Sequence, residues 1–450
     1  LGGYGRGELY PHSDIDLLVC LPEAGSTDTQ ALAEALFHPL WDSGFDVGHG
    51  VRTVAETLEL AASDFEVLCS LLDARLLFGP QAEFDAFRSA VRERLLTPGR
   101  DELVRWLNGR HEERHRRQGE RLLAPNLKDG RGGQRDLQTM RWLELTEPFP
   151  DKRGDFLQLS ERTALAASAE LLARARVALH RASGRKNDIL HLEMQPDLAR
   201  RLGYGAAQER GAVELFLSDL HKAMTEIALF CRLCLNHALA AANVPGRDGG
   251  GLTEVGLDFS VLVADPANIL ELFRHSAQTG VPIGWQTRRI IQARFPSLDT
   301  DTGWQRAVAP RFADILCGPL APHVLGQMLE VGFLNRFLPE FTDVEHLVQF
   351  DAYHLLPVGP HMVETVRQLA FFEFGNEFLG DVLFPLRDVP CLRWAALLHD
   401  IGKAEADHAV RGAEMSRRIL ERLGYDDELC RECAFLIEYQ PVVILAERSD

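Results

Sequence analysis

Positive charge is scarce in this sequence: 48 lysines and arginines stand against 66 aspartates and glutamates, so the formal net charge is −18 and the pI is about 5.4. The broad basic surface of a nucleic-acid-binding protein is therefore not expected. No apolar run reaches the roughly 18 residues that a membrane-spanning helix needs, and no basic-apolar-small leader is visible. We therefore expect a cytoplasmic protein with no nucleic-acid partner and no membrane partner.

Cysteine is too sparse for a disulfide framework, with eight residues in 450. This usage suits a reducing compartment. Two Cys-x-x-Cys pairs occur, Cys231/Cys234 and Cys430/Cys433, but they lie in distant parts of the chain. A zinc site needs a second pair or histidines nearby. We therefore predict that these four thiols face the core.

The length of the chain predicts more than one hydrophobic core. Its composition, 46% hydrophobic and 25% charged, is ordinary for a globular protein. Strand and helix signals alternate over residues 1–80, mainly helical periodicity follows, and residues 245–251 form the clearest linker. The predicted helices are residues 31–41, 54–64, 82–123, 161–182 and 211–243. The predicted strands are residues 46–53 and the segment that carries Asp14. Residues 70–79 form an apolar element, and residues 252–345 are mixed, with a short strand-like piece.

The segment 2–19 carries the strongest functional signal. Gly2 and Gly3 precede Asp14 and Asp16, which lie at alternate positions of an apolar run. Because side chains alternate along a strand, the two carboxylates point to one face. They raise each other's pKa unless a cation neutralises them. Hard divalent ions such as Mg²⁺ bind carboxylates together with substrate phosphates, and glycines let backbone N–H groups approach a triphosphate closely.

A glycine-rich segment, residues 125–136, interrupts the helical pattern. Lys128 and Arg135 lie on this loop, which opens a helix, and such cations suit recognition of a phosphate or of an acidic partner. The alternative is an interdomain turn in which Arg135 and Asp136 form structural ion pairs. The sequence leaves both interpretations open.

A second set of candidate metal ligands lies near the C-terminal end. His399 and Asp400 follow an apolar helix and can chelate one ion, which would activate water for attack on a phosphodiester. A single His-Asp pair is weak support for such a site. Three features strengthen it: His361 on an amphipathic helix 38 residues upstream, Lys403 after a glycine, and His408 before another helix.

These motifs resemble those of one known family. The string from Gly2 to Asp16 resembles the nucleotidyltransferase fold of the DNA polymerase β superfamily. Within it, the string is similar to the bifunctional uridylyltransferase/uridylyl-removing enzymes that modify the PII nitrogen-signalling protein. Residues 125–136 and 184–204 resemble helical segments of that family, and the pattern from His361 to His408 resembles the HD phosphohydrolase superfamily.

The resemblance implies an α+β, mostly helical fold that ends in an all-α HD domain. We expect a small mixed-sheet nucleotidyltransferase domain at 1–115, a helical domain at 116–244, a helical linker region at 252–345 and a shortened HD domain at 346–450. We also expect a fragment. The chain starts at the edge of the catalytic strand, and the resembled enzymes end in glutamine-sensing domains that are not recognisable here.

The resemblance also assigns the first set of residues. Asp14 and Asp16 are implied to be catalytic and to hold Mg²⁺ or Mn²⁺. A third carboxylate, on a neighbouring strand, helps to deprotonate the attacking hydroxyl in this fold. Asp46 and Asp73 both lie in strand-like surroundings, and both remain candidates. The residues implied to line the triphosphate of UTP are Gly2, Gly3 and Ser13.

In the HD region, His361, His399, Asp400 and His408 are the implied ligands of a divalent metal ion. The last aspartate of the pattern is either Asp450 or lies past the end of this chain. Family members carry a His-His pair in the helix before that aspartate, whereas this chain has Glu438-Tyr439-Gln440. The loop that follows Lys403 is also shortened. The hydrolase site is therefore either altered in its metal requirement, weak or inactive.

The function implied is transfer of UMP from UTP to a tyrosine of the PII protein, followed by hydrolytic removal of that UMP at the second site. Sequence alone does not identify the base of the nucleotide. An adenylyltransferase acting on another protein, such as glutamine synthetase, is therefore one alternative. A regulatory module with a decayed hydrolase site is the other.

Overall fold

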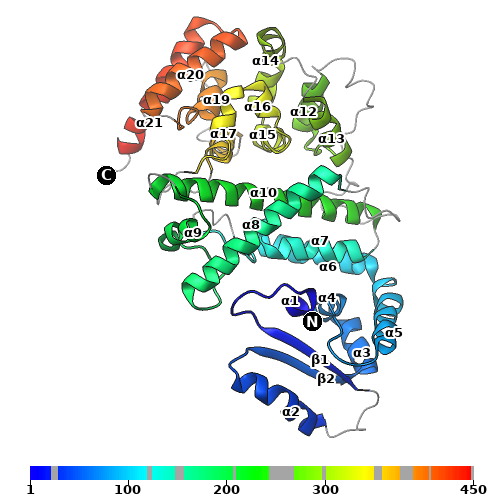
Figure 1. Ribbon diagram of the computed structural model, residues 1–450. Helices are drawn as coiled ribbons and strands as arrows, with labels where there is room; N and C mark the ends of the chain where they lie inside the picture. Colours follow the sequence, from blue (N-terminus) through cyan, green and yellow to red (C-terminus); the bar gives the residue numbers. More distant parts are fainter. Residues whose placement is uncertain are drawn as a thin grey trace. The chain divides into compact units, whose positions relative to one another are not determined.

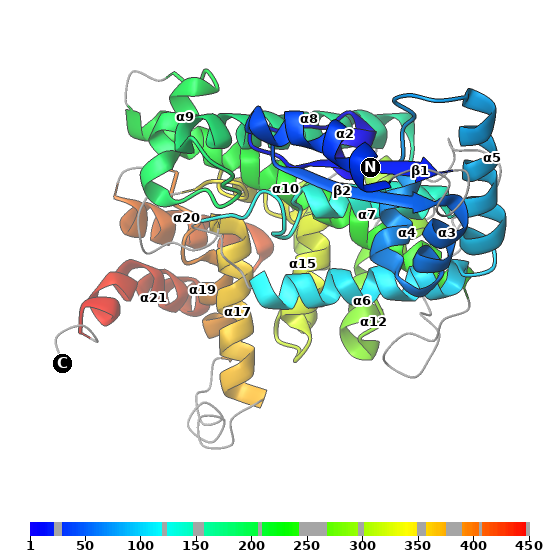
Figure 2. The ribbon, with the colours of Figure 1, turned by 90° about the horizontal axis from the view of Figure 1, so that it is seen from below.

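The computed structural model describes residues 1–21, 29–118, 124–146, 157–205, 209–242, 268–295, 301–348, 357–374, 389–404 and 407–446. The chain divides into two compact units, residues 1–251 and 252–450. Figures 1 and 2 show the described helices and strands of both units. Helices dominate each unit, and the described strands lie at the start of the first.

The described sheet is a pair of parallel strands, β1 (Ile15–Leu21) and β2 (Val47–Thr53). Parallel pairing needs a crossover connection, and α2 (Thr29–Asp42) lies on that connection. Phe37 of α2 is fully buried and its ring lies 4.6 Å from the ring of His49 on β2. Figure 1 shows α2 along one side of the strand pair.

The remaining described helices of the first unit begin with α1 and end with α10. Thr53 and Glu56 form a capping box at the start of α3, and the Asp64 side chain accepts the backbone N–H groups of the first turn of α4. The elements are α1 (Gly2–Arg6), α3 (Val54–Ser63), α4 (Phe65–Leu72), α5 (Gln81–Val91), the π-helix η1 (Arg92–Leu96), α6 (Arg100–Gln118), α7 (Gln134–Leu145), α8 (Leu159–Ser183), the 3₁₀ turn η2 (Leu192–Met194), α9 (Gln195–Arg201) and α10 (Glu209–Ala241).

Two loops of the helical part run side by side. Helix α8 ends at Gly184, whose φ of +63° is the left-handed conformation that favours glycine. The chain that follows pairs with the segment before α7: the Leu127 N–H donates to the Asp188 carbonyl at 2.8 Å, and the Leu190 N–H donates to the Pro125 carbonyl at 3.0 Å. We call residues 124–133 the first loop and residues 184–191 the second loop.

Every described regular element of the second unit is helical. A single apolar cluster joins its helices, with the fully buried rings of Phe312, Phe337 and Trp394 near its centre. The elements are α12 (Asn268–Thr279), α13 (Trp285–Arg294), α14 (Thr302–Leu316), α15 (Ala321–Glu330), α16 (Phe333–Phe337), the 3₁₀ turn η4 (Pro339–Asp343), α17 (Val358–Phe374), α19 (Val389–Leu398), α20 (His408–Leu423) and α21 (Asp427–Ala446).

The structure confirms the mostly helical α+β class, the helices near 31–41, 54–64, 161–182 and 211–243, and the strand 46–53. The apolar element 70–79 is not strand-like: α4 ends at Leu72, and Asp73 is its C-terminal cap. The run 82–123 is not one helix, because Pro98 and Gly99 lie in a turn between η1 and α6. The predicted linker 245–251 and the start of the mixed region lie outside the described residues. Helix α6 crosses the predicted boundary at 115/116.

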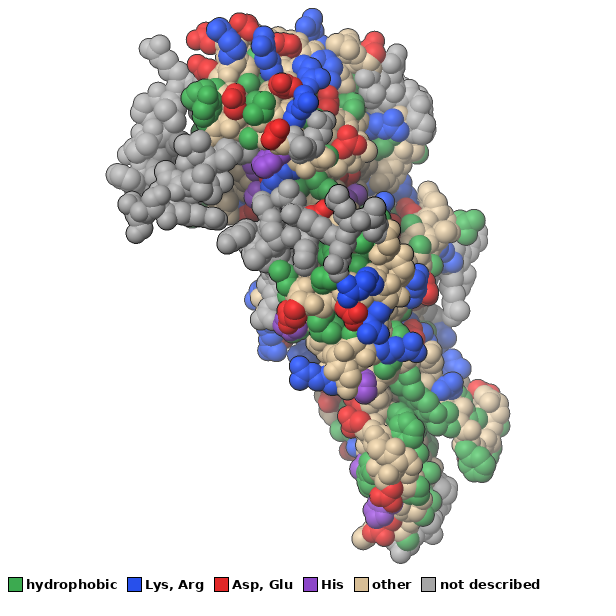
Figure 3. Space-filling model, turned by 60° about the vertical axis from the view of Figure 1, so that its left-hand side comes forward, with side chains coloured by type: hydrophobic (Ala, Val, Ile, Leu, Met, Phe, Trp, Pro, Cys, Tyr) green, Lys and Arg blue, Asp and Glu red, His purple; other side chains and the backbone are tan. Residues whose placement is uncertain are grey.

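None of the described helices combines the length and the apolar character that crossing a bilayer requires. Acidic and basic side chains are interspersed on the face shown in Figure 3. The four paired cysteines, Cys231, Cys234, Cys430 and Cys433, are buried, as predicted.

Candidate active sites

The two aspartates of the first strand lie together at the mouth of a cavity in the first unit. Ile15 pairs with Val47, so alternation places Asp14, Asp16 and Asp46 on the same side of the two strands. We call the surroundings of Asp14 and Asp16 the first site. The cavity has a volume of about 570 Å³, which is within the usual range for ligand sites. Its lining includes Gly2, Gly3, Ser13, Asp14, Asp16, Lys128, Gln134 and Arg135.

Small residues leave space around the Asp16 carboxylate. Gly2 has a φ of +52°, and a Cβ atom at this position would lie 2.9 Å from Asp16 Oδ2. Gly48 of β2 faces the other oxygen, and a Cβ atom there would collide with Asp16 Oδ1. Any side chain at either position would fill the space beside these oxygens. The carboxylates and this space fit a divalent cation.

The negative charges of Asp14 and Asp16 repel each other, which favours binding of a cation at the first site. Burial, together with the neighbouring Asp14 carboxylate, raises the pKa of Asp16. Burial would also raise the pKa of Asp14, but the Lys186 ammonium group and the residue's own backbone N–H lower it. A bound cation would relieve the repulsion that disfavours ionised Asp16.

Asp46 and Asp73, the two candidates for the third carboxylate, have different surroundings. Asp46 is exposed at the start of β2 and lies close enough to Asp16 to raise its pKa. Asp73 is buried, forms an ion pair with Arg6 and accepts a hydrogen bond from Trp142 Nε1 at 3.2 Å. Asp73 lines the cavity and Asp46 is not among its lining residues, but Asp73 is already engaged by these structural partners, so both remain candidates and Asp46 is the one we propose.

Asp136, in the glycine-rich segment, has a structural role. Its carboxylate is fully buried, forms an ion pair with Arg114 and accepts the Gly132 N–H at 2.7 Å. His111 Nδ1 and His115 Nε2 each lie 3.3 Å from one of its oxygens. The ligand atoms of Asp136, His111 and Cys231 lie within 4.8 Å of one another, but Arg114 already supplies a cation to this carboxylate. Asp136 therefore ties the segment to α6.

Arg135 and Lys128 have different surroundings from Asp136. Both line the cavity of the first site. Arg135 is 40% exposed, and its Nε lies 3.5 Å from Asp129 Oδ1. The two interpretations of the glycine-rich segment therefore apply to different residues. Asp136 forms structural ion pairs, whereas Lys128 and Arg135 face the space where a phosphate or an acidic partner would bind.

The second site, in the other unit, consists of His361 from α17 and His399 and Asp400 from the turn after α19. The two Nε2 atoms of His361 and His399 are 3.1 Å apart. Asp400 Oδ2 lies 3.5 Å from the first and 3.2 Å from the second. His399 Nδ1 lies 2.9 Å from the Ala396 carbonyl, so it carries the proton, and Nε2 is left as the ligand atom.

The three groups fit a divalent metal ion. Asp400 is 3% exposed, and its Oδ2 atom is buried. The same oxygen lies 2.6 Å from the Lys403 ammonium group, whose side chain is 5% exposed. Burial would raise the pKa of Asp400, but His399 and Lys403 lower it below its ordinary value. The carboxylate is therefore ionised beside two imidazoles, which is the donor set of a metal site.

Among the described residues, the converging ligand group of the second site includes no other residue predicted for it. His408 is exposed at the start of α20 and is not among the three ligands that converge. Glu438 and Tyr439 of α21 are exposed as well. The side chain of Gln440 and all of Asp450 lie outside the described residues. The role of His408 as a ligand therefore stays a prediction.

Sequence reasoning missed Lys186, whose Nζ lies 3.5 Å from Asp14 Oδ1. It belongs to residues 184–204, which carry a family resemblance but no chemical signature of their own. Its proximity to Asp14 depends on the pairing of the first and second loops, and local sequence does not show that pairing.

Comparison with known proteins finds a family profile within each of the two units. The family profile described as GlnD PII-uridylyltransferase matches residues 105–235, and the HD domain profile matches residues 361–441. Curated relatives named bifunctional uridylyltransferase/uridylyl-removing enzyme are 30% identical in Ruegeria pomeroyi and 31% identical in Phenylobacterium zucineum. These alignments cover 100% and 98% of this chain but 53% and 51% of the relatives. The chain thus spans about half the length of the relatives it matches.

Proposed function

Because the chain is homologous along its whole length to bifunctional uridylyltransferase/uridylyl-removing enzymes, we propose that it transfers UMP from UTP to a tyrosine of a PII-type signalling protein. The reaction is assigned to the first site. The observation that carries this proposal is the placement of Asp14 and Asp16 on one side of β1, at a cavity wide enough for a nucleotide. The proposed use of UTP supports a cytoplasmic location.

Nucleotidyl transfer is an in-line displacement at the α-phosphorus, so catalysis depends on positioning and on neutralising charge. Asp14 and Asp16 would hold Mg²⁺, which supplies the neutralising charge when bound. Gly2 and Ser13 line the cavity where the phosphates would lie. Asp46, which is exposed next to β2 and close enough to Asp16 to raise the pKa of Asp16, would accept the proton of the attacking tyrosine hydroxyl.

The direct test is labelling of purified PII protein with UTP in the presence and absence of Mg²⁺. We expect UMP-labelled PII that depends on the metal ion, and no labelling by a chain carrying both Asp14→Ala and Asp16→Ala. ATP in place of UTP tests the adenylyltransferase alternative, and glutamine synthetase serves there as the acceptor. Failure of wild-type protein to label PII with either nucleotide would exclude the proposed acceptor.

The second reaction proposed is hydrolytic removal of UMP from modified PII at the second site. His361, His399 and Asp400 would hold a divalent ion, which supplies Lewis acidity for attack of water on the phosphodiester. The Lys403 ammonium group lies 2.6 Å from Oδ2 of the Asp400 carboxylate, the same oxygen that faces the two histidines. His399 keeps its Nδ1 proton on the Ala396 carbonyl, which fixes the ring orientation that metal binding needs.

The hydrolase is tested separately with PII that has already been uridylylated. We expect UMP release by a chain whose first site is disabled, and no release after His399→Ala. Glu438 and Tyr439 stand where family members carry the His-His pair, so a regulatory module with a decayed hydrolase site is the competing interpretation of this unit. No UMP release and no bound metal ion in the wild-type chain would support it.

A further inference from the structure

Lysine is rare in this chain, and its positions are informative. The sequence has five lysines, Lys128, Lys152, Lys186, Lys222 and Lys403. Of the four in the described part of the chain, Lys403 pairs with Asp400 at the second site, and Lys128 and Lys186 lie at the first. A lysine ammonium group is a compact point charge on a flexible stem, unlike the planar guanidinium group of arginine.

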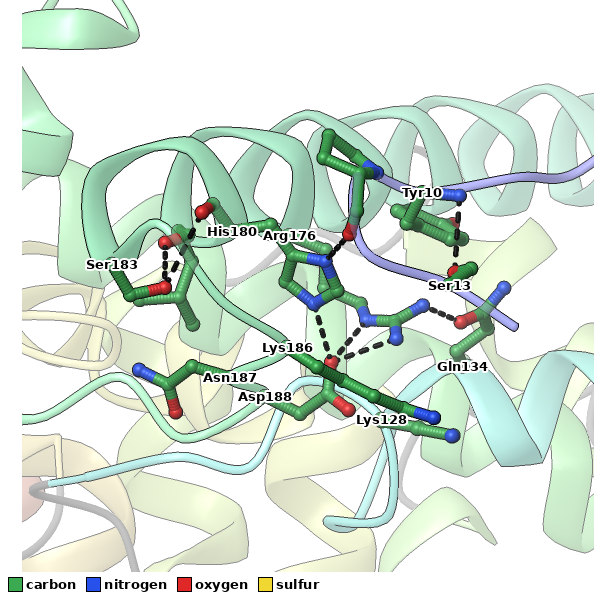
Figure 4. Close-up of polar contacts among 12 residues, drawn as sticks. Tyr10, Ser13, Lys128, Gln134, Arg176, His180, Ser183, Lys186, Asn187 and Asp188 are labelled. Atoms are coloured by element: carbon green, nitrogen blue, oxygen red, sulfur yellow. Dashed lines mark hydrogen bonds and ion pairs between the residues drawn. The ribbon is translucent and has the colours of Figure 1, made fainter. Parts of the chain in front are cut away.

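The pairing of two loops brings Lys128 and Lys186 together. An antiparallel bridge joins Asn126 of the first loop to Ile189 of the second. The side chains of Lys128 and Lys186 extend in the same direction in Figure 4, and Lys186 lies close enough to lower the pKa of Lys128. Lys186 Nζ is 3.5 Å from Asp14 Oδ1. The two ammonium groups therefore face the edge of the catalytic strand.

A network of hydrogen bonds and ion pairs holds the second loop in place. The acidic residue of this network is Asp188, which belongs to the same loop as Lys186. Asp188 Oδ1 accepts from Arg176 Nε at 2.8 Å and lies 3.1 Å from His180 Nε2. The other imidazole nitrogen of His180 contacts the Pro11 carbonyl, and the Arg176 guanidinium stacks 4.0 Å from the ring of Tyr10. Figure 4 shows these contacts linking α8 to the chain that leads into β1.

Lys128 and Lys186 differ in their carboxylate partners: in the described part of the chain, Lys186 forms an ion pair with Asp14, whereas Lys128 forms none. Asp188 is engaged by the network. Burial, Arg135 and Lys186 each make it harder to charge Lys128 and lower its pKa, although nearby acids oppose them. An anion between the two ammonium groups would relieve this repulsion.

We propose that Lys128 and Lys186 clamp the β- and γ-phosphates of the nucleoside triphosphate, and that Lys186 leaves Asp14 when the metal-bound nucleotide arrives. This inference rests on the proposed nucleotidyl transfer at the first site. The exchange is geometrically simple, because the Lys186 side chain is 42% exposed and its carboxylate partner 50% exposed. In the nucleotide-free protein, Lys186 is therefore paired with the Asp14 carboxylate, which would become a ligand of the metal ion.

The clamp is tested by measuring the affinity of the whole chain for UTP, UDP and UMP with Mg²⁺ present. Charge-assisted contacts to the outer phosphates should make wild-type affinity rise with each phosphate. Lys128→Ala and Lys186→Ala should each weaken UTP binding about tenfold or more and change UMP binding less than about twofold. Lys186→Arg should restore part of the UTP affinity.

Lys222→Ala is the matched control, because Lys222 is exposed on α10 of the same unit, does not line the cavity as Lys128 does, and is not paired with Asp14 as Lys186 is. It should bind all three nucleotides as wild type does. If Lys186 merely neutralises Asp14, its removal will leave the UTP affinity unchanged or improve it. Equal weakening of UTP and UMP would also overturn the clamp.

The outcomes separate the clamp from the proposed function. Wild-type protein that labels PII while both lysine variants keep wild-type UTP affinity overturns the clamp alone. UTP binding that needs both lysines, without labelling of PII, overturns the acceptor and leaves the clamp standing. Wild-type protein that does not bind UTP overturns both.

Discussion

Replacing Asp73 with asparagine is expected to lower the free energy of unfolding of the first unit by about 3 kcal/mol. The Asp73 side chain is 1% exposed, and that of its partner Arg6 is 5% exposed. Removing one member of a buried ion pair leaves the other charge uncompensated, which costs about 3–5 kcal/mol. We take the lower end because Arg6 keeps its 2.7 Å contact with Glu8 and an asparagine oxygen can still accept from Trp142.

Asp46→Asn should show the opposite behaviour. Asp46 is exposed, so its replacement should change the free energy of unfolding by less than about 0.5 kcal/mol. If Asp46 accepts the proton of the attacking hydroxyl, the same change should slow UMP transfer about 100-fold or more. We therefore expect Asp73→Asn to lower stability mainly and Asp46→Asn to lower activity mainly.

The assay is hydrogen exchange in increasing urea, read on peptides from α1 and α7, since the two units of the chain need not unfold together. Initial rates of PII labelling are measured at a temperature where both variants are folded. Asp73→Asn combined with Arg6→Gln should cost less stability than the two single changes added together. An Asp73→Asn chain of wild-type stability that no longer transfers UMP, beside a fully active Asp46→Asn chain, would refute the reasoning.

Three further predictions concern the loops and the second site. Gly132→Ala should lower the free energy of unfolding of the first unit by about 2–4 kcal/mol, because the φ of Gly132 is +72° and a Cβ atom there would collide with the backbone of α10. Gly184 has a φ of +63°, but open space surrounds it. Gly184→Ala should therefore cost only about 1 kcal/mol in the same urea titration. Burial would raise the pKa of Asp188, but a histidine hydrogen bond and an arginine guanidinium lower it to about 2. Its stabilisation is thus full above a pH of about 4 and lost as the pH falls towards 2, and Asp188→Asn should flatten the loss of stability measured between about pH 4 and pH 2. In a chain whose first site is disabled, His361→Ala should weaken Mn²⁺ binding at least about tenfold in calorimetric titration, whereas equal weakening by His408→Ala would make His408 a ligand.

The parts of the first site that follow from local periodicity could be predicted. Alternation along one strand put Asp14 and Asp16 on the same face, and the structure places both at one cavity. Asp73 could not be interpreted in the same way. A short apolar run such as 70–79 does not distinguish a strand from the end of a helix, and the ion pair that buries Asp73 joins residues far apart in the sequence.

The break within 82–123 did have a local signal. Pro98 and Gly99 interrupt helical structure, but the many charged residues on either side made the run resemble one solvated helix. The position of Lys186 had no such signal. It follows from the bridge between Asn126 and Ile189, a long-range pairing that only the folded chain reveals.

The two sites share one feature that the motifs do not show: each has a lysine against a carboxylate that would ligate the metal ion. At the second site Lys403 is 5% exposed and 2.6 Å from Asp400 Oδ2, so removing it would leave a buried negative charge. At the first site Lys186 is 42% exposed and 3.5 Å from Asp14 Oδ1, and exposed pairs contribute little to stability. Lys403 is thus part of the folded framework of its site, whereas Lys186 is free to exchange one anionic partner for another. This difference in burial is why we assign nucleotide binding to Lys186 and not to Lys403.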